Sequence, residues 1–116
     1  MTREFVMMPE FDSQWRRMGL NDDDLKRLQE TLVKDPKAGV AITGTGGLRK
    51  IRVAFPNQGK SGSGRVAYVD FAVFESIYLI TAFPKNEKAN FSAKEKNEIA
   101  RLINILEDGF RKGANK

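Results

Sequence analysis

The sequence contains neither cysteine nor histidine. Without cysteine the chain has no disulfide bond, no thiolate nucleophile and no Cys-based zinc or iron–sulfur site. Without histidine it lacks the commonest general base and the commonest transition-metal ligand, which excludes Ser-His-Asp and Cys-His catalysis. Any reaction that the chain catalyses depends on carboxylates, amines, guanidinium groups, hydroxyls or a nucleophile of the substrate. We predict no cofactor and no metal ion.

Long apolar runs are also missing. None approaches the roughly 20 residues that cross a bilayer, and the first residues lack the apolar core of a secretory signal. We therefore expect a cytoplasmic protein that does not bind a membrane. The 116 residues, 41% of them hydrophobic and 30% charged, are typical of a globular protein. Because domains usually contain about 100–150 residues, we predict a single domain over residues 1–116.

Positive charge is concentrated in the middle of the chain. The whole sequence has 20 Lys and Arg against 15 Asp and Glu, a net charge of +5. Residues 36–69 contain six cations and no acidic residue. The rest of the chain therefore contains the other 14 Lys and Arg and all 15 acidic residues. Cations without counter-charges indicate an anion-binding surface, with nucleic acid or phosphate as the leading ligands. The alternative is a solvated basic face without a specific ligand. The six cations are Lys37, Arg49, Lys50, Arg52, Lys60 and Arg65.

Apolar spacing and capping residues predict three helices. Residues 11–18 carry apolar side chains at i, i+4 and i+7, which is the pattern of a short amphipathic helix. Asn21 is placed to cap a second helix, and Pro36 follows the end of that helix. The sequence Ser92-Ala-Lys-Glu95 is a capping box, in which each side chain accepts a hydrogen bond from the other residue's backbone. It predicts the start of a C-terminal helix.

Strands are predicted where apolar residues alternate or run together. In one of them Ile51, Val53 and Phe55 share a face, and Lys50 and Arg52 lie on the opposite face. We predict an α+β fold in which N-terminal helices and a C-terminal helix pack on an antiparallel sheet of about four to five strands. The helices are expected on one side of the sheet, with the basic face left open. The predicted strands cover residues 5–8, 40–42, 49–55, 65–71 and 77–83.

Four cations are expected to meet on the open face. On antiparallel strands Lys50, Arg52 and Arg65 share this face, and Lys85 follows the end of a neighbouring strand. Such a cluster would hold a phosphodiester and stabilise the additional negative charge of its transition state. RNA supplies its own nucleophile, the 2′-hydroxyl, so the cluster suits RNA cleavage without histidine, cysteine or metal. Phosphate binding without any reaction fits the same residues.

Two basic, glycine-containing segments, one tripeptide and one turn carry a family resemblance. They resemble the HigB-type branch of the RelE/ParE toxin superfamily over roughly residues 25–106. The resemblance implies a RelE-like fold and a type II toxin that cleaves messenger RNA in the ribosomal A site. It also implies a helix-turn-helix antitoxin as partner, with DNA contacted only through the antitoxin complex. The segments are Gly44-Thr-Gly-Gly-Leu-Arg-Lys-Ile-Arg52, Gly59-Lys-Ser-Gly-Ser-Gly-Arg65, Lys85-Asn-Glu87 and the turn Asp35-Pro-Lys-Ala-Gly39.

By this resemblance the catalytic residues are Lys50, Arg52, Arg65 and Lys85. Lys50 and Arg52 match the paired basic positions of the catalytic strand in RelE-like toxins. Arg65 matches the arginine that opens the next strand and grips the scissile phosphate, and Lys85 matches the lysine after the central strand. We expect Lys50 or Lys85 to donate or accept the proton, because neighbouring cations favour the neutral form of a lysine.

After Lys85 the sequence departs from the family pattern. RelE has an arginine at the next position, where this chain has Asn86. It also has a tyrosine a few residues later that stacks on the RNA base, where this chain has Phe91 and Ser92. A phenylalanine can stack but cannot donate a proton. The residues predicted to bind RNA are Arg49, Lys60, Asn86 and Phe91.

Two other functions fit the same basic residues. A non-catalytic RNA- or phosphate-binding module would bind with a steep salt dependence and leave its ligand uncut. A ParE-like gyrase inhibitor would share the fold, since a fold does not fix a function. The retained basic cluster argues mildly against the gyrase inhibitor.

Overall fold

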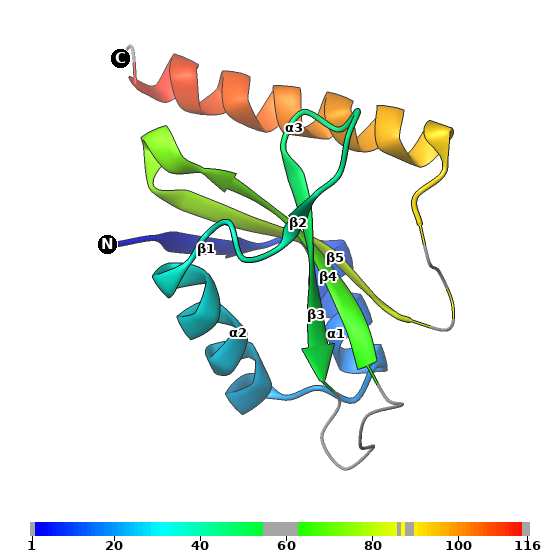
Figure 1. Ribbon diagram of the computed structural model, residues 1–116. Helices are drawn as coiled ribbons and strands as arrows, with labels where there is room; N and C mark the ends of the chain where they lie inside the picture. The colour runs from blue at the N-terminus through cyan, green and yellow to red at the C-terminus, as the bar shows by residue number, and fades with distance from the viewer. Residues whose placement is uncertain (1, 55–62, 86, 88–89, 115–116) are drawn as a thin grey trace.

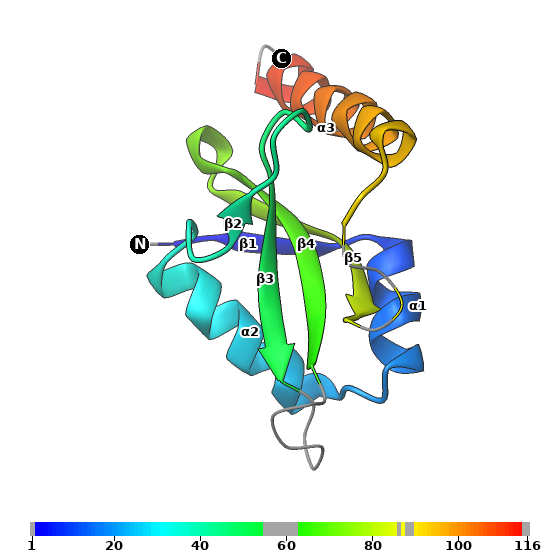
Figure 2. The ribbon, with the colours of Figure 1, turned by 45° about the vertical axis from the view of Figure 1, so that its right-hand side comes forward.

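The computed structural model describes residues 2–54, 63–85, 87 and 90–114. A five-stranded sheet lies at the centre, with two helices against one face and a third helix across the other (Figures 1 and 2). The α+β class is therefore confirmed. In chain order the elements are β1 (Glu4–Met7), α1 (Pro9–Arg17), α2 (Asp22–Lys34), β2 (Val40–Ala41), β3 (Leu48–Ala54), β4 (Ser63–Phe71), the 3-10 turn η2 (Ala72–Phe74), β5 (Ser76–Pro84) and α3 (Ala93–Ala114).

The sheet is mixed rather than wholly antiparallel. Its strands lie in the order β1-β5-β4-β3-β2. The predicted antiparallel pairing is confirmed for β2–β3, β3–β4 and β4–β5, whereas β1 runs parallel to β5. A tight turn makes its two strands antiparallel. Because β1 is separated from β5 by most of the chain, no such turn fixes its direction.

Helices cover both faces of the sheet, and the expectation of helices on one side is wrong. The reason is that β4 and β5 are buried along most of their length on both faces, so a second apolar face needs its own cover. The α1–α2 cluster contains Phe11, Trp15, Leu20, Leu28, Leu32, Val66, Tyr68, Ile77, Leu79 and Ala82, with Ile51 and Val53 packed against it. The α3 cluster on the other face contains Leu48, Ala67, Val69, Phe71, Ile80, Phe83, Phe91 and Ile103.

Helix α3 covers only part of its face. In both views it crosses one end of β3 and β4, while their other ends extend past it (Figures 1 and 2). Those extended ends carry the last residues of β3 and the first of β4, on either side of residues 55–62. The prediction of an open basic face therefore holds for this end of the two strands.

Two capping boxes fix the starts of α2 and α3; the sequence predicted the box at Ser92–Glu95 and, at α2, Asn21 as the cap. The Asn21 side chain accepts a hydrogen bond from the Asp24 backbone N–H at 2.9 Å, and the Asp24 carboxylate accepts one from the Asn21 N–H at 2.9 Å. Ser92 and Glu95 make the same reciprocal pair at 3.1 and 2.9 Å. Each pair satisfies backbone donors that a helix start leaves without intrahelical partners.

Tyr68 fastens the turn between α2 and β2 onto the sheet. Its side chain is fully buried, and its hydroxyl donates to the carbonyl oxygen of Pro36 at 2.8 Å and accepts from the N–H of Gly39 at 2.9 Å. A Cβ on Gly39 would lie 2.8 Å from the Tyr68 ring and 2.9 Å from the carbonyl oxygen of Lys50, so the close approach requires glycine. Burial raises the pKa of the Tyr68 hydroxyl.

Replacing Tyr68 by phenylalanine tests this turn. Tyr68→Phe is expected to lower the free energy of unfolding by about 1–3 kcal/mol, because two buried backbone groups lose their partner. The pKa of Tyr68 is raised in the folded state. The contribution of its hydroxyl to the free energy of unfolding is therefore complete below the unfolded pKa of 10.0, and it is lost progressively as the pH rises from there through the folded pKa. Urea unfolding at neutral pH and at about pH 11 measures both effects. A difference between wild type and variant that does not narrow at the higher pH would contradict this account.

Candidate functional site

The pairing of β3 with β4 brings the predicted catalytic cations together. Arg52 lies directly opposite Arg65 in the antiparallel register, where Cβ atoms are about 4.5–5.5 Å apart. Lys50 is two residues from Arg52 on the same strand and therefore shares its face. Lys85 follows β5, and its backbone N–H donates to the carbonyl oxygen of Ser63 at 3.0 Å, which places it beside the start of β4. We call Lys50, Arg52, Arg65 and Lys85 the basic cluster.

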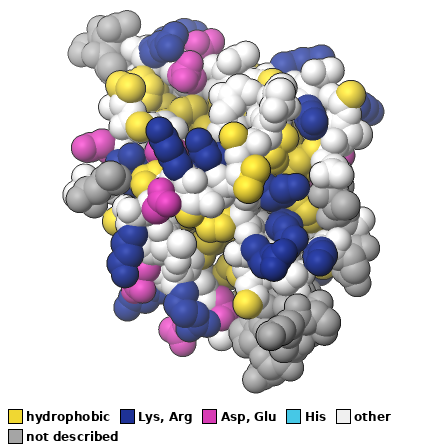
Figure 3. All heavy atoms as spheres, in the orientation of Figure 1, with side chains coloured by type: hydrophobic (Ala, Val, Ile, Leu, Met, Phe, Trp, Pro, Cys, Tyr) yellow, Lys and Arg dark blue, Asp and Glu magenta, His cyan; other side chains and the backbone are white. Residues whose placement is uncertain are grey.

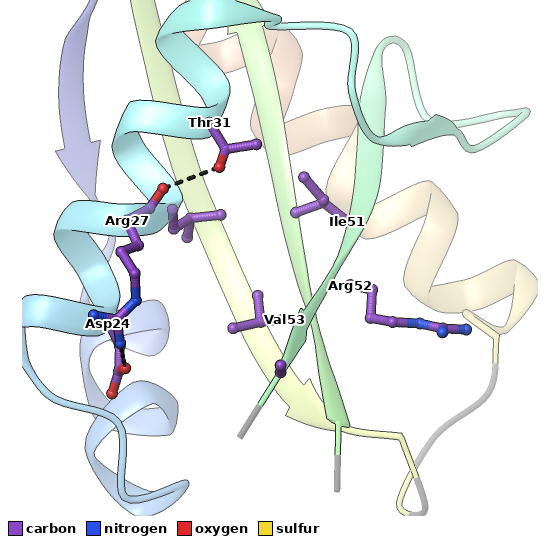
Figure 4. A pocket seen from close by; sticks show the side chains of 8 residues that line it. Asp24, Arg27, Thr31, Ile51, Arg52 and Val53 are labelled. Carbon is purple, nitrogen blue, oxygen red and sulfur yellow. Dashed lines mark hydrogen bonds and ion pairs between the residues drawn. The ribbon is translucent and has the colours of Figure 1, made fainter. Parts of the chain in front are cut away.

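The basic cluster lies on the α3 side of the sheet. Ala67 is opposite Lys50 and Phe83 is opposite Arg65, and both belong to the α3 cluster. Figure 4 shows Arg52 directed away from α2, on the other side of β3 from that helix. Because α3 crosses only the far end of these strands, Arg52 and Lys85 are exposed, while Lys50 and Arg65 are half-buried.

The basic cluster has little internal charge compensation. Within the described residues, no carboxylate forms an ion pair with Arg52, Arg65 or Lys85. The Arg65 guanidinium donates one hydrogen bond, of 3.1 Å, to the carbonyl oxygen of Gly64. Figure 3 shows dark blue side chains gathered right of centre, in the region of β3 and β4, with no acidic side chain among them. An anion would therefore find several N–H donors available.

The opposite side of β3 holds a hollow of about 330 Å³ between this strand and α2. Ile51 and Val53 point into it, and the ion pair of Arg27 with Asp24 lies at its rim (Figure 4). Arg52 borders this hollow but points away from it. Small ligands usually occupy enclosed, mostly apolar cavities. The basic cluster, on an open face, is instead suited to a large anion that lies across the surface.

Two residues predicted to bind RNA are held by contacts within the protein. The Arg49 guanidinium donates to the carbonyl oxygen of Gly39 at 2.7 Å, on the Tyr68 side of the sheet, and so helps to hold the turn before β2. The Phe91 ring is 8% exposed and packs edge-on against Phe83, with ring centroids 5.5 Å apart. Arg49 therefore points away from the basic cluster, and little of the Phe91 ring is exposed for stacking on a base. Lys60 and Asn86 lie outside the described residues.

Tyr68 is a positioning residue that the sequence analysis did not identify. By holding Pro36 and Gly39, it fixes the segment that leads into β2, which in turn pairs with Arg49 and Lys50 of β3. A signal for this role was present, because a tyrosine in an otherwise apolar strand needs a partner for its hydroxyl when it is buried. Which backbone groups meet that hydroxyl depends on long-range packing.

The described residues include no cluster of three or more potential metal-binding side chains. In the same part of the chain, no helix combines the length and apolar character needed to cross a membrane. The chemistry available at the basic cluster is that of guanidinium and ammonium groups, which bind phosphate and stabilise negative charge.

Comparison with known proteins agrees with this geometry. The model of a family described as the RelE toxin of the RelE/RelB toxin–antitoxin system matches residues 8–112. The structure of a double arginine-to-alanine mutant of E. coli toxin RelE in the free state is similar, with a TM-score of 0.54 and 17% sequence identity, and the match covers 77% of this chain and 90% of that chain. The structural likeness shows a shared fold. The family match spans most of the sequence, and the chain therefore belongs to the RelE toxin family of toxin–antitoxin systems.

Proposed function

We propose that this toxin is of the HigB type and cleaves messenger RNA on the ribosome, with the substrate 2′-hydroxyl as nucleophile and without a metal ion. The observation that carries the proposal is the pairing of Arg52 with Arg65 on an open sheet face, beside Lys50 and Lys85. Like charges directly opposite each other destabilise a sheet. Such a pair is useful where an anion binds between the two cations, and a phosphodiester near its transition state is such an anion.

Each cation has a proposed role in the cleavage. Arg52 and Arg65 hold the non-bridging oxygens of the scissile phosphate, since a guanidinium offers paired donors that match phosphate. The 2′-oxygen bonds to phosphorus and gives its proton to a general base. The bond from phosphorus to the 5′-oxygen then breaks, and that oxygen receives a proton from a general acid. Lys50 and Lys85 are the proposed acid and base, and the products are a 2′,3′-cyclic phosphate and a 5′-hydroxyl.

The surroundings of the basic cluster support a role for the ribosome. Among the described residues, no exposed aromatic ring lies beside the cluster, and Phe91 is packed in the core. Proteins that bind single-stranded RNA alone usually stack its bases on aromatic side chains. The cations supply phosphate contacts only. We therefore propose that the ribosome presents the codon in a fixed conformation and that the toxin acts on its backbone.

The proposed protein partner is a helix-turn-helix antitoxin encoded beside the toxin. An acidic or helical segment of this antitoxin is proposed to cover the basic cluster or to block entry into the ribosome, because Arg52, Arg65 and Lys85 form no ion pair with a described carboxylate. Contact with DNA arises only through the antitoxin in the complex.

The substrate-nucleophile mechanism is tested by removing one oxygen from the message. In a purified translation system, mapping of 5′ ends is expected to locate the cut in wild-type reactions. A message with a single 2′-deoxynucleotide at that position is expected to stay intact there, because the nucleophile is gone, whereas the same change two codons away leaves cleavage unaffected. Cleavage of the first message at the original position would refute the mechanism. Bound but uncut RNA would identify a binding module, and inhibited DNA supercoiling a gyrase inhibitor.

The assignment of the cations is tested by charge-removing variants. Arg65→Gln with Lys85→Gln is expected to reduce inhibition of translation by about 10²-fold or more, since loss of one stabilising donor already has an effect of this size. The control, Arg101→Gln with Lys112→Gln, removes the same charge from the exposed face of α3 and is expected to inhibit like wild type. Equal inhibition by both double variants would show that the assignment is wrong.

Thermal unfolding separates a catalytic from a structural role of Arg52. Arg52→Gln removes one of two cations that face each other across β3 and β4, so the midpoint of unfolding is expected to stay equal or rise. Inhibition of translation is expected to fall in the same variant. A lowered midpoint together with lost inhibition would instead indicate that Arg52 supports the fold.

A further inference from the structure

A second hollow, of about 280 Å³, lies along the outer edge of β5. Within the described residues, β1 pairs with β5 only as far as Leu79. Beyond that point, β5 borders the hollow, and residues of α1 and of the start of α3 line its remaining walls. Phe83, Phe91 and Ile99 contribute apolar surface to it. We call this hollow the β5 groove.

Carboxylates surround the β5 groove although the whole chain carries a net charge of +5. Glu10 comes from α1, Glu87 from the turn after β5, and Glu95 and Glu98 from α3. Glu10 makes no ion pair with another described residue, and Glu98 is 4.0 Å from the ammonium of Lys94. Glu10 and Glu98, with Lys94 as their one ion-pair partner among the described residues, therefore give this rim a local negative excess in a protein whose overall charge is positive.

At the rim of the groove, Glu87 binds the guanidinium group of another residue of this chain, Arg17. Arg17 donates to both of its carboxylate oxygens, at 2.6 and 3.3 Å. This two-bond arrangement is the geometry in which arginine and a carboxylate recognise each other. Both side chains are about half exposed, so the pair lies at the mouth of the groove rather than filling it.

Thr81 gives an independent indication of a ligand. Its side chain lines the groove and the residue is only 9% exposed, yet its hydroxyl makes no hydrogen bond to another described residue. Buried hydroxyl groups are nearly always hydrogen-bonded. No described side-chain nitrogen or oxygen is both fully enclosed and without a partner, so the Thr81 hydroxyl keeps some accessible surface, at a residue that lines the groove. It is placed to bond with a group that enters there.

The arrangement favours an extended cation over a metal ion. The described residues offer no three carboxylates close enough to bind one metal ion. A lysine or arginine side chain fits better, because its aliphatic stem can lie on the apolar surface of Phe83 and Ile99 while its charged head reaches the rim. RNA is disfavoured in the groove, because the carboxylates repel its phosphates.

We propose that the β5 groove binds an arginine- or lysine-bearing segment of a protein partner. One cationic head is held between Glu10 of α1 and Glu98 of α3, and the Thr81 hydroxyl accepts or donates one hydrogen bond. The groove adjoins the basic cluster, since Phe83 lies opposite Arg65, but it does not include any of the four cations. The proposal is therefore independent of the proposed RNA cleavage.

Binding of a defined peptide to the full-length chain tests the proposal. The probe is a fluorescently labelled eight-residue peptide of alternating arginine and alanine, followed by anisotropy at low and at physiological salt. Wild type is expected to bind it saturably and more weakly at higher salt. Glu10→Gln with Glu98→Gln is expected to weaken binding about tenfold, as the loss of two partly exposed charge pairs implies. Absence of saturable binding to wild type would overturn the proposal.

Two controls separate the groove from general charge effects. Asp23→Asn with Asp108→Asn removes the same charge from exposed positions outside the groove and is expected to bind like wild type; equal weakening in both double variants would overturn the proposal. Thr81→Val is expected to weaken binding severalfold without lowering the unfolding midpoint, since it removes an unpartnered hydroxyl. Unchanged peptide affinity in Thr81→Val would refute the role of the hydroxyl.

A third variant separates this proposal from the proposed function. Arg52→Gln with Arg65→Gln is expected to lose inhibition of translation while keeping its peptide affinity, because neither residue lines the groove. If wild type inhibits translation but does not bind the peptide, only the groove proposal is wrong. Lost peptide binding in this variant would show that binding depends on residues outside the groove and would overturn the groove assignment.

Discussion

The antiparallel register of β3 and β4 is the constraint on which the rest of the structure depends. It sets Arg52 against Arg65 and, by alternation, turns Ile51 and Val53 toward α2. A shift of one residue would turn the side chains of β3 to the opposite faces and carry Lys50 and Arg52 into the α1–α2 cluster. Apolar burial on one face therefore fixes the register, and the cations on the other face are positioned by it.

Alternation along β3 also divides structural from proposed catalytic roles between neighbouring residues. Arg49 faces the Tyr68 side and bonds to the turn before β2, whereas Lys50 faces the α3 side and joins the basic cluster. The Tyr68 hydroxyl holds the same turn. Arg52 and Arg65 repel each other on one face of the strand pair. Apolar packing and hydrogen bonds to the backbone on the other face offset this repulsion.

Charge of opposite sign is separated over a short distance on the α3 side of the sheet. The basic cluster occupies β3, β4 and the end of β5, and the anionic groove begins at the outer edge of β5. The pairing of Arg65 with Phe83 joins the two regions. An RNA backbone drawn to the cations would be kept from the groove by its carboxylates. The net charge of the chain, +5, conceals this division because it sums both surfaces.

The sequence by itself determined the features that depend on residues close together in the chain. Capping at Asn21 and Ser92, the strand that alternates around Arg52 and the excess of cations in residues 36–69 all follow from local spacing, because helix caps and side-chain alternation are set within a few residues. Tertiary structure alone decided the parallel direction of β1, the position of α3 on the second face and the burial of Phe91. It also assembled the β5 groove from α1, β5 and α3. These features arise from contacts between distant segments, whose direction and packing no local pattern specifies.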